Sequence, residues 1–96
     1  MSRSVIQSSR FKKDYKRVQS NKAIVSKLRQ IVADLAADKP LDPSCRDHEL
    51  GNNWSGFRDC HVRPDLVLIY QKTDAEIRIL RLERLGSHAE LFGLPR

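Results

Sequence analysis

The sequence predicts an α+β domain in which a helical hairpin packs on one face of a mainly antiparallel, four-stranded sheet. Apolar residues recur at helical spacing up to residue 35, and the spacing becomes that of strands after residue 53. The run 66–70 is apolar at every position, which is typical of a central strand covered on both faces. A chain of 96 residues is expected to form one domain, over residues 1–96.

The first half of the chain is predicted to hold one strand and two helices. Residues 4–7 favour a short strand. The first helix is indicated by Phe11, Tyr15 and Val18. Asn21 is the expected N-cap of the second helix, whose apolar stripe is Ile24, Val25, Leu28, Ile31, Val32 and Leu35. Pro40 is expected to end this helix, and the short connection predicts an antiparallel pair.

The second half is predicted to be a loop followed by three strands. Residues 42–53 have the composition of an irregular loop. The strands are expected over 54–62, 66–70 and 77–85, with turns at 63–65 and 72–74. With helices on one face of the sheet, the other face and one end stay available for a functional site.

The charge of the chain is unevenly distributed. The net charge is +6, and residues 1–33 hold nine Lys and Arg against the single acid Asp14. Basic helices of this kind attract polyanions such as RNA, DNA or the ribosome, although they are also compatible with a merely solvated face. No apolar run approaches the roughly 20 residues of a membrane span, and no secretion signal is evident. We therefore expect a cytoplasmic protein without a membrane partner, in which Cys45 and Cys60 stay reduced.

Residues with catalytic potential gather at the ends of the predicted segments: His48, Asp59, His61, Asp65 and His88. His61 and Asp65 lie on either side of a tight turn, so their side chains are expected to meet. The strand before His88 is expected to pair with the central strand and bring that histidine near the same turn. The loop that carries His48 is free to fold over this place.

This inventory suits the cleavage of RNA by internal transesterification. One group removes the proton of the 2′-hydroxyl and another protonates the departing 5′-oxygen, and imidazoles serve both roles near neutral pH. Arginines stabilise the extra negative charge of the phosphorane, and the local candidates are Arg58, Arg63, Arg81 and Arg84. Phe92 is a candidate for stacking on a base, although an aromatic residue near the C-terminus also suits a core position.

A zinc site is the alternative interpretation of the same residues. Cys45 and His48 have ligand-like spacing, and Cys60, His61 and His88 are further ligand types. Cys60 and His61 are neighbours on a strand, however, and therefore point to opposite faces. We expect neither a metal nor another cofactor.

Three segments together resemble the YafQ-type toxins of the RelE/ParE superfamily. They are DHEL at 47–50, LGNNWSGFRDCHVRPDLVLIY at 50–70 and RLGSHAELF at 84–92. The resemblance implies a microbial RNase fold with a curved sheet. It assigns His48, His61, Asp65 and His88 to an acid/base group, Phe92 to an mRNA base, and a weaker role to Asp59. Leu85 replaces a threonine that is common in that family, and Ser87 is a conservative exchange.

The resemblance also implies an activity and partners. The activity is cleavage of mRNA in the ribosomal A site without a metal, with the basic helices docked on 16S and 23S rRNA. A cognate antitoxin, of a ribbon-helix-helix kind similar to DinJ, would neutralise the toxin. Two other functions share this fold: a gyrase inhibitor of the ParE branch, which needs no acid/base group, and a non-catalytic RNA-binding module.

Overall fold

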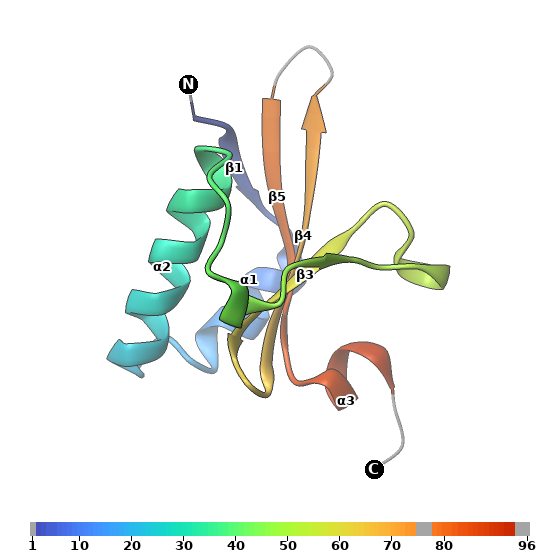
Figure 1. Ribbon diagram of the computed structural model, residues 1–96. Coiled ribbons are helices and arrows are strands. Elements are labelled where there is room, and N and C mark those ends of the chain that lie inside the picture. The colour runs from blue at the N-terminus through green and yellow to red at the C-terminus, as the bar shows by residue number, and fades with distance from the viewer. Residues whose placement is uncertain (1, 75–77, 94–96) are drawn as a thin grey trace.

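The computed structural model describes residues 2–74 and 78–93 and contains a single five-stranded sheet (Figure 1). Its strand order is β1-β5-β4-β3-β2. The strands are β1 (Ser4–Gln7), β2 (His48–Glu49), β3 (Arg58–Arg63), β4 (Leu66–Asp74) and β5 (Arg78–Gly86). Only β1 and β5 pair in parallel, so the predicted α+β class and mainly antiparallel sheet are confirmed. The fifth strand, β2, lies in the segment predicted to be a loop.

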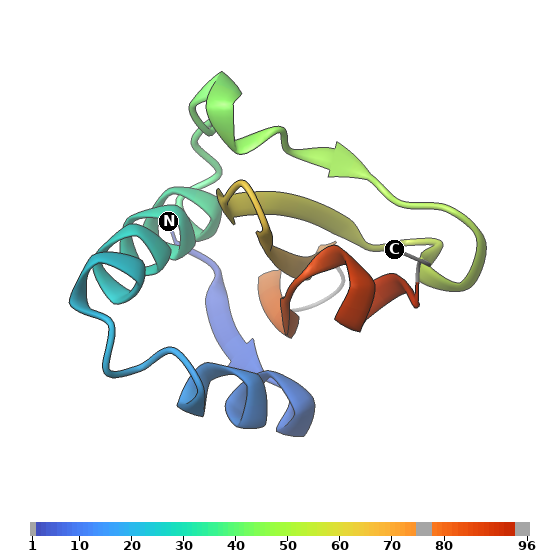
Figure 2. The same cartoon turned by 90° about the horizontal axis from the view of Figure 1, so that it is seen from below.

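Three helices accompany the sheet: α1 (Ser9–Lys16), α2 (Lys22–Ala36) and α3 (His88–Phe92). The predicted cap of α2 is confirmed, because the Asn21 side chain accepts a hydrogen bond from the Ile24 N–H. Helices α1 and α2 follow each other directly but diverge from their short link, and each packs mainly on the sheet (Figure 2). The predicted hairpin is therefore an open pair of helices and not a tight antiparallel one.

Helix α2 ends at Ala36, well before Pro40. Asp38 adopts a left-handed conformation (φ 56°), and the Lys39 N–H donates to the Asp34 carbonyl across the helix end. This termination places the Asp38 carboxylate beside Arg3, Lys72 and Arg78. The helix therefore ends in a local turn whose Asp38 carboxylate binds Lys72 of β4 and Arg78 of β5.

The strand boundaries also differ from the prediction. Residues 52–54 form a 3₁₀ turn, and Gly56 has a positive φ of 91°, so β3 begins at Arg58 and not at residue 54. Strand β4 continues to Asp74 through the predicted turn at 72–74, because those residues pair with β5. The predicted first residue of the last strand, Ile77, lies outside the described residues.

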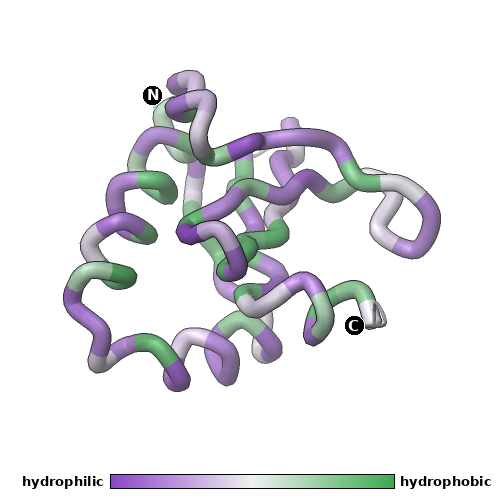
Figure 3. The backbone as a smooth tube through the Cα atoms, turned by 60° about the horizontal axis from the view of Figure 1, so that its bottom comes forward, coloured by the Kyte–Doolittle hydropathy of each residue, from purple (hydrophilic) through white to green (hydrophobic). Residues whose placement is uncertain are grey.

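The core has two parts, one on each face of the sheet. Between the sheet and helices α1 and α2 lie Phe11, Leu28, Ile31, Leu35, Cys45, Cys60, Val62, Leu68, Tyr70, Leu80, Leu82 and Leu85. Most apolar positions of α2 turn toward this layer (Figure 3), but Val25, which was predicted to belong to the apolar stripe, lines the outer side of the helix. On the other face Val67, Ile69 and Leu91 pack with Leu50, Trp54, Phe57 and Phe92. Strand β4 is therefore covered on both faces, as predicted.

Two buried ionic contacts fasten helices to the sheet. Arg3 is 8% exposed and binds Asp38 and Asp74. Asp14 of α1 is 4% exposed, accepts two hydrogen bonds from Arg84 and takes a third from the Leu85 N–H. In the part of the chain that the structure describes, no helix has the length and apolar character required to cross a bilayer.

Candidate active site

The face of the sheet opposite α1 and α2 carries the predicted acid/base residues. Strands β2 and β3 pair so that His48 lies next to Asp59, and His61 follows on the same face of β3. At the end of β5, helix α3 places His88 and Phe92 one turn apart. Three separate segments of the chain, β2, β3 and the end of β5 with α3, therefore meet at one place.

His48 is oriented by two acceptors. Its Nδ1 lies 2.8 Å from the Arg46 carbonyl oxygen and 3.0 Å from Asp59 Oδ1. An imidazole nitrogen has one hydrogen to donate, and its hydrogen bond goes to the Arg46 carbonyl. In this tautomer Nε2 of the half-exposed ring has a free lone pair to offer a substrate.

Asp59 is the buried charge of the site. It is 2% exposed, and its Oδ1 has no hydrogen-bond donor among the described residues, although His48 Nδ1 is close. Burial raises the pKa of the Asp59 carboxyl, while the charges of His48, His61 and His88 act in the opposite direction. The Asp59 carboxyl therefore lies close enough to the three imidazoles to interact with them through charge.

His88 is the centre of the second half of the site. Its ring centroid lies 5.1 Å from that of His61 and 6.0 Å from that of Phe92. Its Nδ1 is 3.5 Å from Asp65 Oδ1, on the turn after β3. The Asp65 side chain is three-quarters exposed, whereas that of His88 is little more than one-third exposed. His61 and Asp65 therefore each lie beside His88, in agreement with the predicted approach of His88 to this turn.

His88 and Phe92 border an open groove of about 490 Å³. His48, Asp59 and His88 supply its polar wall, and Leu50, Trp54 and Phe92 supply apolar and aromatic surface. Trp54 is held edge-on against Phe57, with ring centroids 5.4 Å apart. Such a groove can hold a flat base next to groups that donate and accept protons.

The four candidate arginines differ in whether a carboxylate pairs with them. Arg84 binds Asp14, Arg81 binds Glu83, and Arg58 binds Asp47. Within the described residues Arg63 alone of the four has no carboxylate within salt-bridge distance, and it is exposed. Arg58 also belongs with Tyr70 and Asp47 on the helix-covered side of β3, away from the groove.

The zinc interpretation is not supported by the placement of the two thiols. Cys45 and Cys60 are both buried in the core beneath α2, and burial raises the pKa of the Cys60 thiol. His61 and His88 lie on the other face of the sheet. Across residues 2–74 and 78–93, no group of three or more His, Cys, Asp or Glu side chains has the arrangement of a metal site.

Sequence reasoning missed two elements that build the site. One is α3, whose Ser87 and Glu90 form a reciprocal capping box. The spacing Ser-x-x-Glu is a known helix start signal, so this helix was detectable. The other is β2, which has only two residues and forms because β3 offers an unpaired edge.

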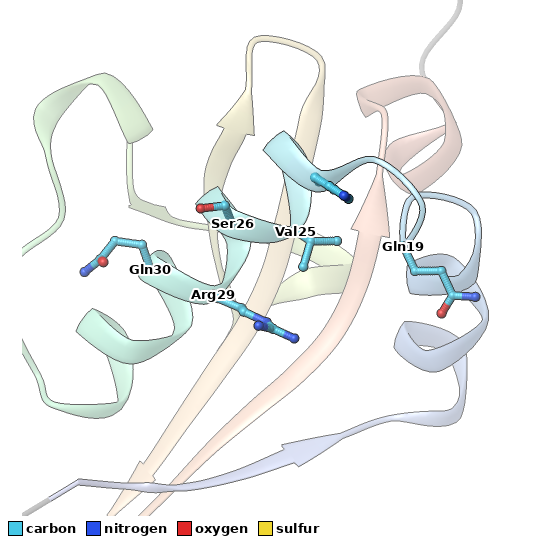
Figure 4. A pocket seen from close by; sticks show the side chains of 6 residues that line it. Gln19, Val25, Ser26, Arg29 and Gln30 are labelled. Carbon is cyan, nitrogen blue, oxygen red and sulfur yellow. The ribbon is translucent and has the colours of Figure 1, made fainter.

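A second concavity, of about 500 Å³, lies on the outer side of α2 and its link from α1 (Figure 4). It is lined by Gln19, Lys22, Val25, Ser26, Arg29 and Gln30. Apart from Val25 the side chains are polar or cationic, and none of them has acid/base capacity near neutral pH. We therefore place the candidate chemistry in the groove and not on this surface.

Comparison with known proteins agrees with the geometry of the site. Residues 3–93 match the family described as "Bacterial toxin of type II toxin-antitoxin system, YafQ". The Escherichia coli BL21(DE3) protein named mRNA interferase toxin YafQ is 41% identical over 92 residues, which cover 95% of this chain and 97% of that protein.

Solved structures give the same result. The crystal structure of YafQ from that strain has a TM-score of 0.83 at 40% identity and covers 95% of this chain and 99% of that one. YafQ in the E. coli DinJ-YafQ toxin-antitoxin complex has a TM-score of 0.82 at 39% identity and covers 97% and 100%. The chain therefore belongs to the YafQ family of bacterial toxins of type II toxin–antitoxin systems.

Proposed function

We propose that this toxin cleaves mRNA in the ribosomal A site by metal-independent acid/base transesterification. As a member of the YafQ family it is an endoribonuclease of the mRNA interferase type. The observation that carries the mechanism is the contact of His88 with His61, Asp65 and Phe92 at the end of an open groove.

The reaction needs one proton acceptor and one proton donor. Asp65 or His61 removes the proton of the ribose 2′-hydroxyl, whose oxygen attacks the adjacent phosphorus. His88, in its protonated form, transfers a proton to the departing 5′-oxygen as the P–O5′ bond breaks. The products are a 2′,3′-cyclic phosphate and a 5′-hydroxyl, and one proton has been taken up and one released.

The other residues of the site support this exchange. His48 is held by Arg46 and offers Nε2 to the substrate. Asp59 is buried, and its carboxyl lies 3.0 Å from His48 Nδ1, where it helps to hold that ring in place. Phe92 lies beside His88 and is suited to stack on the base next to the cleaved bond.

The ribosome is expected to supply the alignment that this small protein lacks. The groove is open and its lining includes no Lys or Arg to hold the phosphates of a flexible RNA, so binding alone gives little positioning. The cationic outer side of α2, with Lys22 and Arg29, offers a surface for 16S or 23S rRNA (Figure 4). We further propose that a cognate antitoxin neutralises the toxin, as DinJ is found in complex with YafQ.

The test is a cleavage assay on mRNA held in programmed bacterial ribosomes, with free mRNA and a gyrase supercoiling assay alongside. Wild-type protein is expected to cut the ribosome-bound mRNA, to leave the free mRNA largely intact and to spare gyrase. His88→Ala is expected to lose at least about 100-fold in rate, the usual worth of a general acid. Full activity of His88→Ala would refute the assignment of His88 as the general acid. Equal cleavage of free and ribosome-bound mRNA would refute ribosome dependence. Gyrase inhibition without cleavage would indicate the ParE-like mechanism.

A further inference from the structure

A cationic pocket adjoins the proposed active site, and its lysine and arginine side chains have no role in the acid/base scheme. It has a volume of about 350 Å³ and lies where α2, the 3₁₀ turn η1 (Pro43–Cys45) and the turn after β3 meet. Its lining includes Lys27, Ser44, Arg46, His61 and Arg63. We call it the basic pocket.

The charges of the basic pocket are not neutralised from within. Within the described part of the chain, Lys27, Arg46 and Arg63 have no carboxylate within salt-bridge distance, unlike Arg58, Arg81 and Arg84. Asp42 interacts with Lys27 through charge, but it lies outside the lining and accepts a hydrogen bond from the Ser44 N–H. Three unpaired cations around one concavity create a strong positive potential, which attracts an anion.

His61 connects the basic pocket to the place of cleavage. It lines the pocket, and its ring centroid lies 5.1 Å from that of His88 in the neighbouring groove. An RNA strand with one base against Phe92 in the groove would therefore continue past His61 into the pocket. The group that such a strand brings there is the phosphodiester of the next nucleotide.

Arg46 links the two sites a second time. Its side chain lines the basic pocket, while its carbonyl oxygen accepts the hydrogen bond from His48 Nδ1. It stands in a left-handed conformation (φ 49°), on a short connection between η1 and β2. An anion that fixes the Arg46 side chain also fixes the carbonyl that orients His48.

We propose that the basic pocket is a phosphate subsite, in which Lys27, Arg46 and Arg63 bind the phosphodiester that flanks the cleaved bond. This rests on the proposed nuclease function and adds a binding site to it. The subsite contributes affinity and strand position, whereas proton transfer stays with the histidines and Asp65.

The first test is binding of an uncleavable strand, a fluorescent DNA hexanucleotide, which has the phosphates but lacks the 2′-hydroxyl. Arg63→Gln and Lys27→Gln are each expected to weaken binding about tenfold at low salt and to reduce the salt slope of log K by roughly 0.7. Lys39→Gln is the matched control, because it also removes one exposed positive charge but lies after the C-terminal end of α2, outside the basic pocket. It should change the affinity and the salt slope only by the small effect of the lower net charge.

The second test replaces single phosphates of the hexanucleotide by uncharged methylphosphonates. Wild-type protein should lose affinity most at one position, and Arg63→Gln should be insensitive at that same position. Equal losses at all positions, or the same profile in wild type and variant, would overturn the phosphate subsite.

The binding tests separate this proposal from the nuclease function. Wild-type cleavage on ribosomes together with unchanged binding by Arg63→Gln would refute the subsite and leave the function intact. No wild-type cleavage together with position-specific binding would refute the function and retain an anion site. Thermal unfolding of each variant excludes misfolding as the cause, since these exposed side chains should alter stability by less than about 0.5 kcal/mol.

Discussion

Replacing Asp14 by alanine is expected to destabilise the protein more than any other single carboxylate replacement on its helices. The side chain is 4% exposed and accepts hydrogen bonds from Arg84 Nε at 2.8 Å, Arg84 Nη2 at 3.2 Å and the Leu85 N–H at 2.9 Å. Asp14→Ala leaves a guanidinium and a buried backbone N–H without their acceptor. The contact also joins α1 to the part of β5 that leads into α3.

The size of the effect follows from these three bonds. Hydrogen bonds to charged groups contribute about 1.5–3 kcal/mol each, and breaking a fully buried pair costs about 3–5 kcal/mol. The Arg84 side chain stays 21% exposed, so water can solvate it in part, and we expect a loss of about 3 kcal/mol. For a domain of this size that lowers Tm by roughly 12–24 °C.

Urea unfolding followed by circular dichroism measures this loss at pH 7. Burial opposes ionisation of Asp14, but the hydrogen bonds from Arg84 and Leu85 prevail and lower the pKa of the carboxyl. Its contribution is therefore fully present above the ordinary carboxyl pKa of about 4 and disappears as the pH falls through the lowered value. The difference between wild type and Asp14→Ala should shrink accordingly in acid.

Two variants control the argument. Asp34 on α2 bonds to Gln30 at the surface, so Asp34→Ala should cost less than about 0.5 kcal/mol. A double variant, Asp14→Leu with Arg84→Leu, should regain stability over Asp14→Ala because no unpaired charge stays inside. A loss below about 1 kcal/mol for Asp14→Ala would show that this contact does not hold α1 to the sheet.

Three further changes probe the site. Burial raises the pKa of Asp59, so its negative charge lowers the stability of the protein as the pH rises above about 4. Asp59→Asn should therefore be more stable than wild type at pH 7 and as stable as wild type below about pH 4. Equal urea midpoints of the two proteins at both pH values would contradict this. Ser87→Ala removes the cap of α3 and should cost about 1 kcal/mol and slow cleavage through misplacement of His88, whereas unchanged Tm and rate would exclude such a role. Phe92→Ala should weaken mRNA cleavage about 5- to 150-fold while Phe92→Tyr keeps the ring and the rate, and equal rates for the two variants would argue against stacking.

The elements with strong periodicity were predictable from the sequence. The apolar stripe of α2 and its Asn21 cap, and the doubly buried strand β4, are found where the pattern indicated them. The spacing of the acid/base residues at segment ends also anticipated the approach of His88 to His61 and Asp65. These features depend on local rules, which a sequence carries directly.

What escaped prediction depends on contacts between distant residues. The two-residue β2 exists only because β3 offers it an edge, and Arg84 is directed to Asp14 by the docking of α1. The burial of Asp59 follows from that same strand pairing, so a weak candidate became the buried charge of the site. No local pattern contains this information.

The parallel pairing of β1 with β5 has a consequence for folding during synthesis. Ser8, just after β1, donates its hydroxyl hydrogen to the carbonyl of Glu83, 75 residues later in the chain. Strand β1 therefore cannot pair until β5 has been synthesised. At a synthesis rate of about 5–20 residues per second this wait lasts roughly 4–15 s. His88 and Phe92 emerge later still. A nascent chain therefore cannot assemble the candidate site until its last strand and helix α3 have been synthesised.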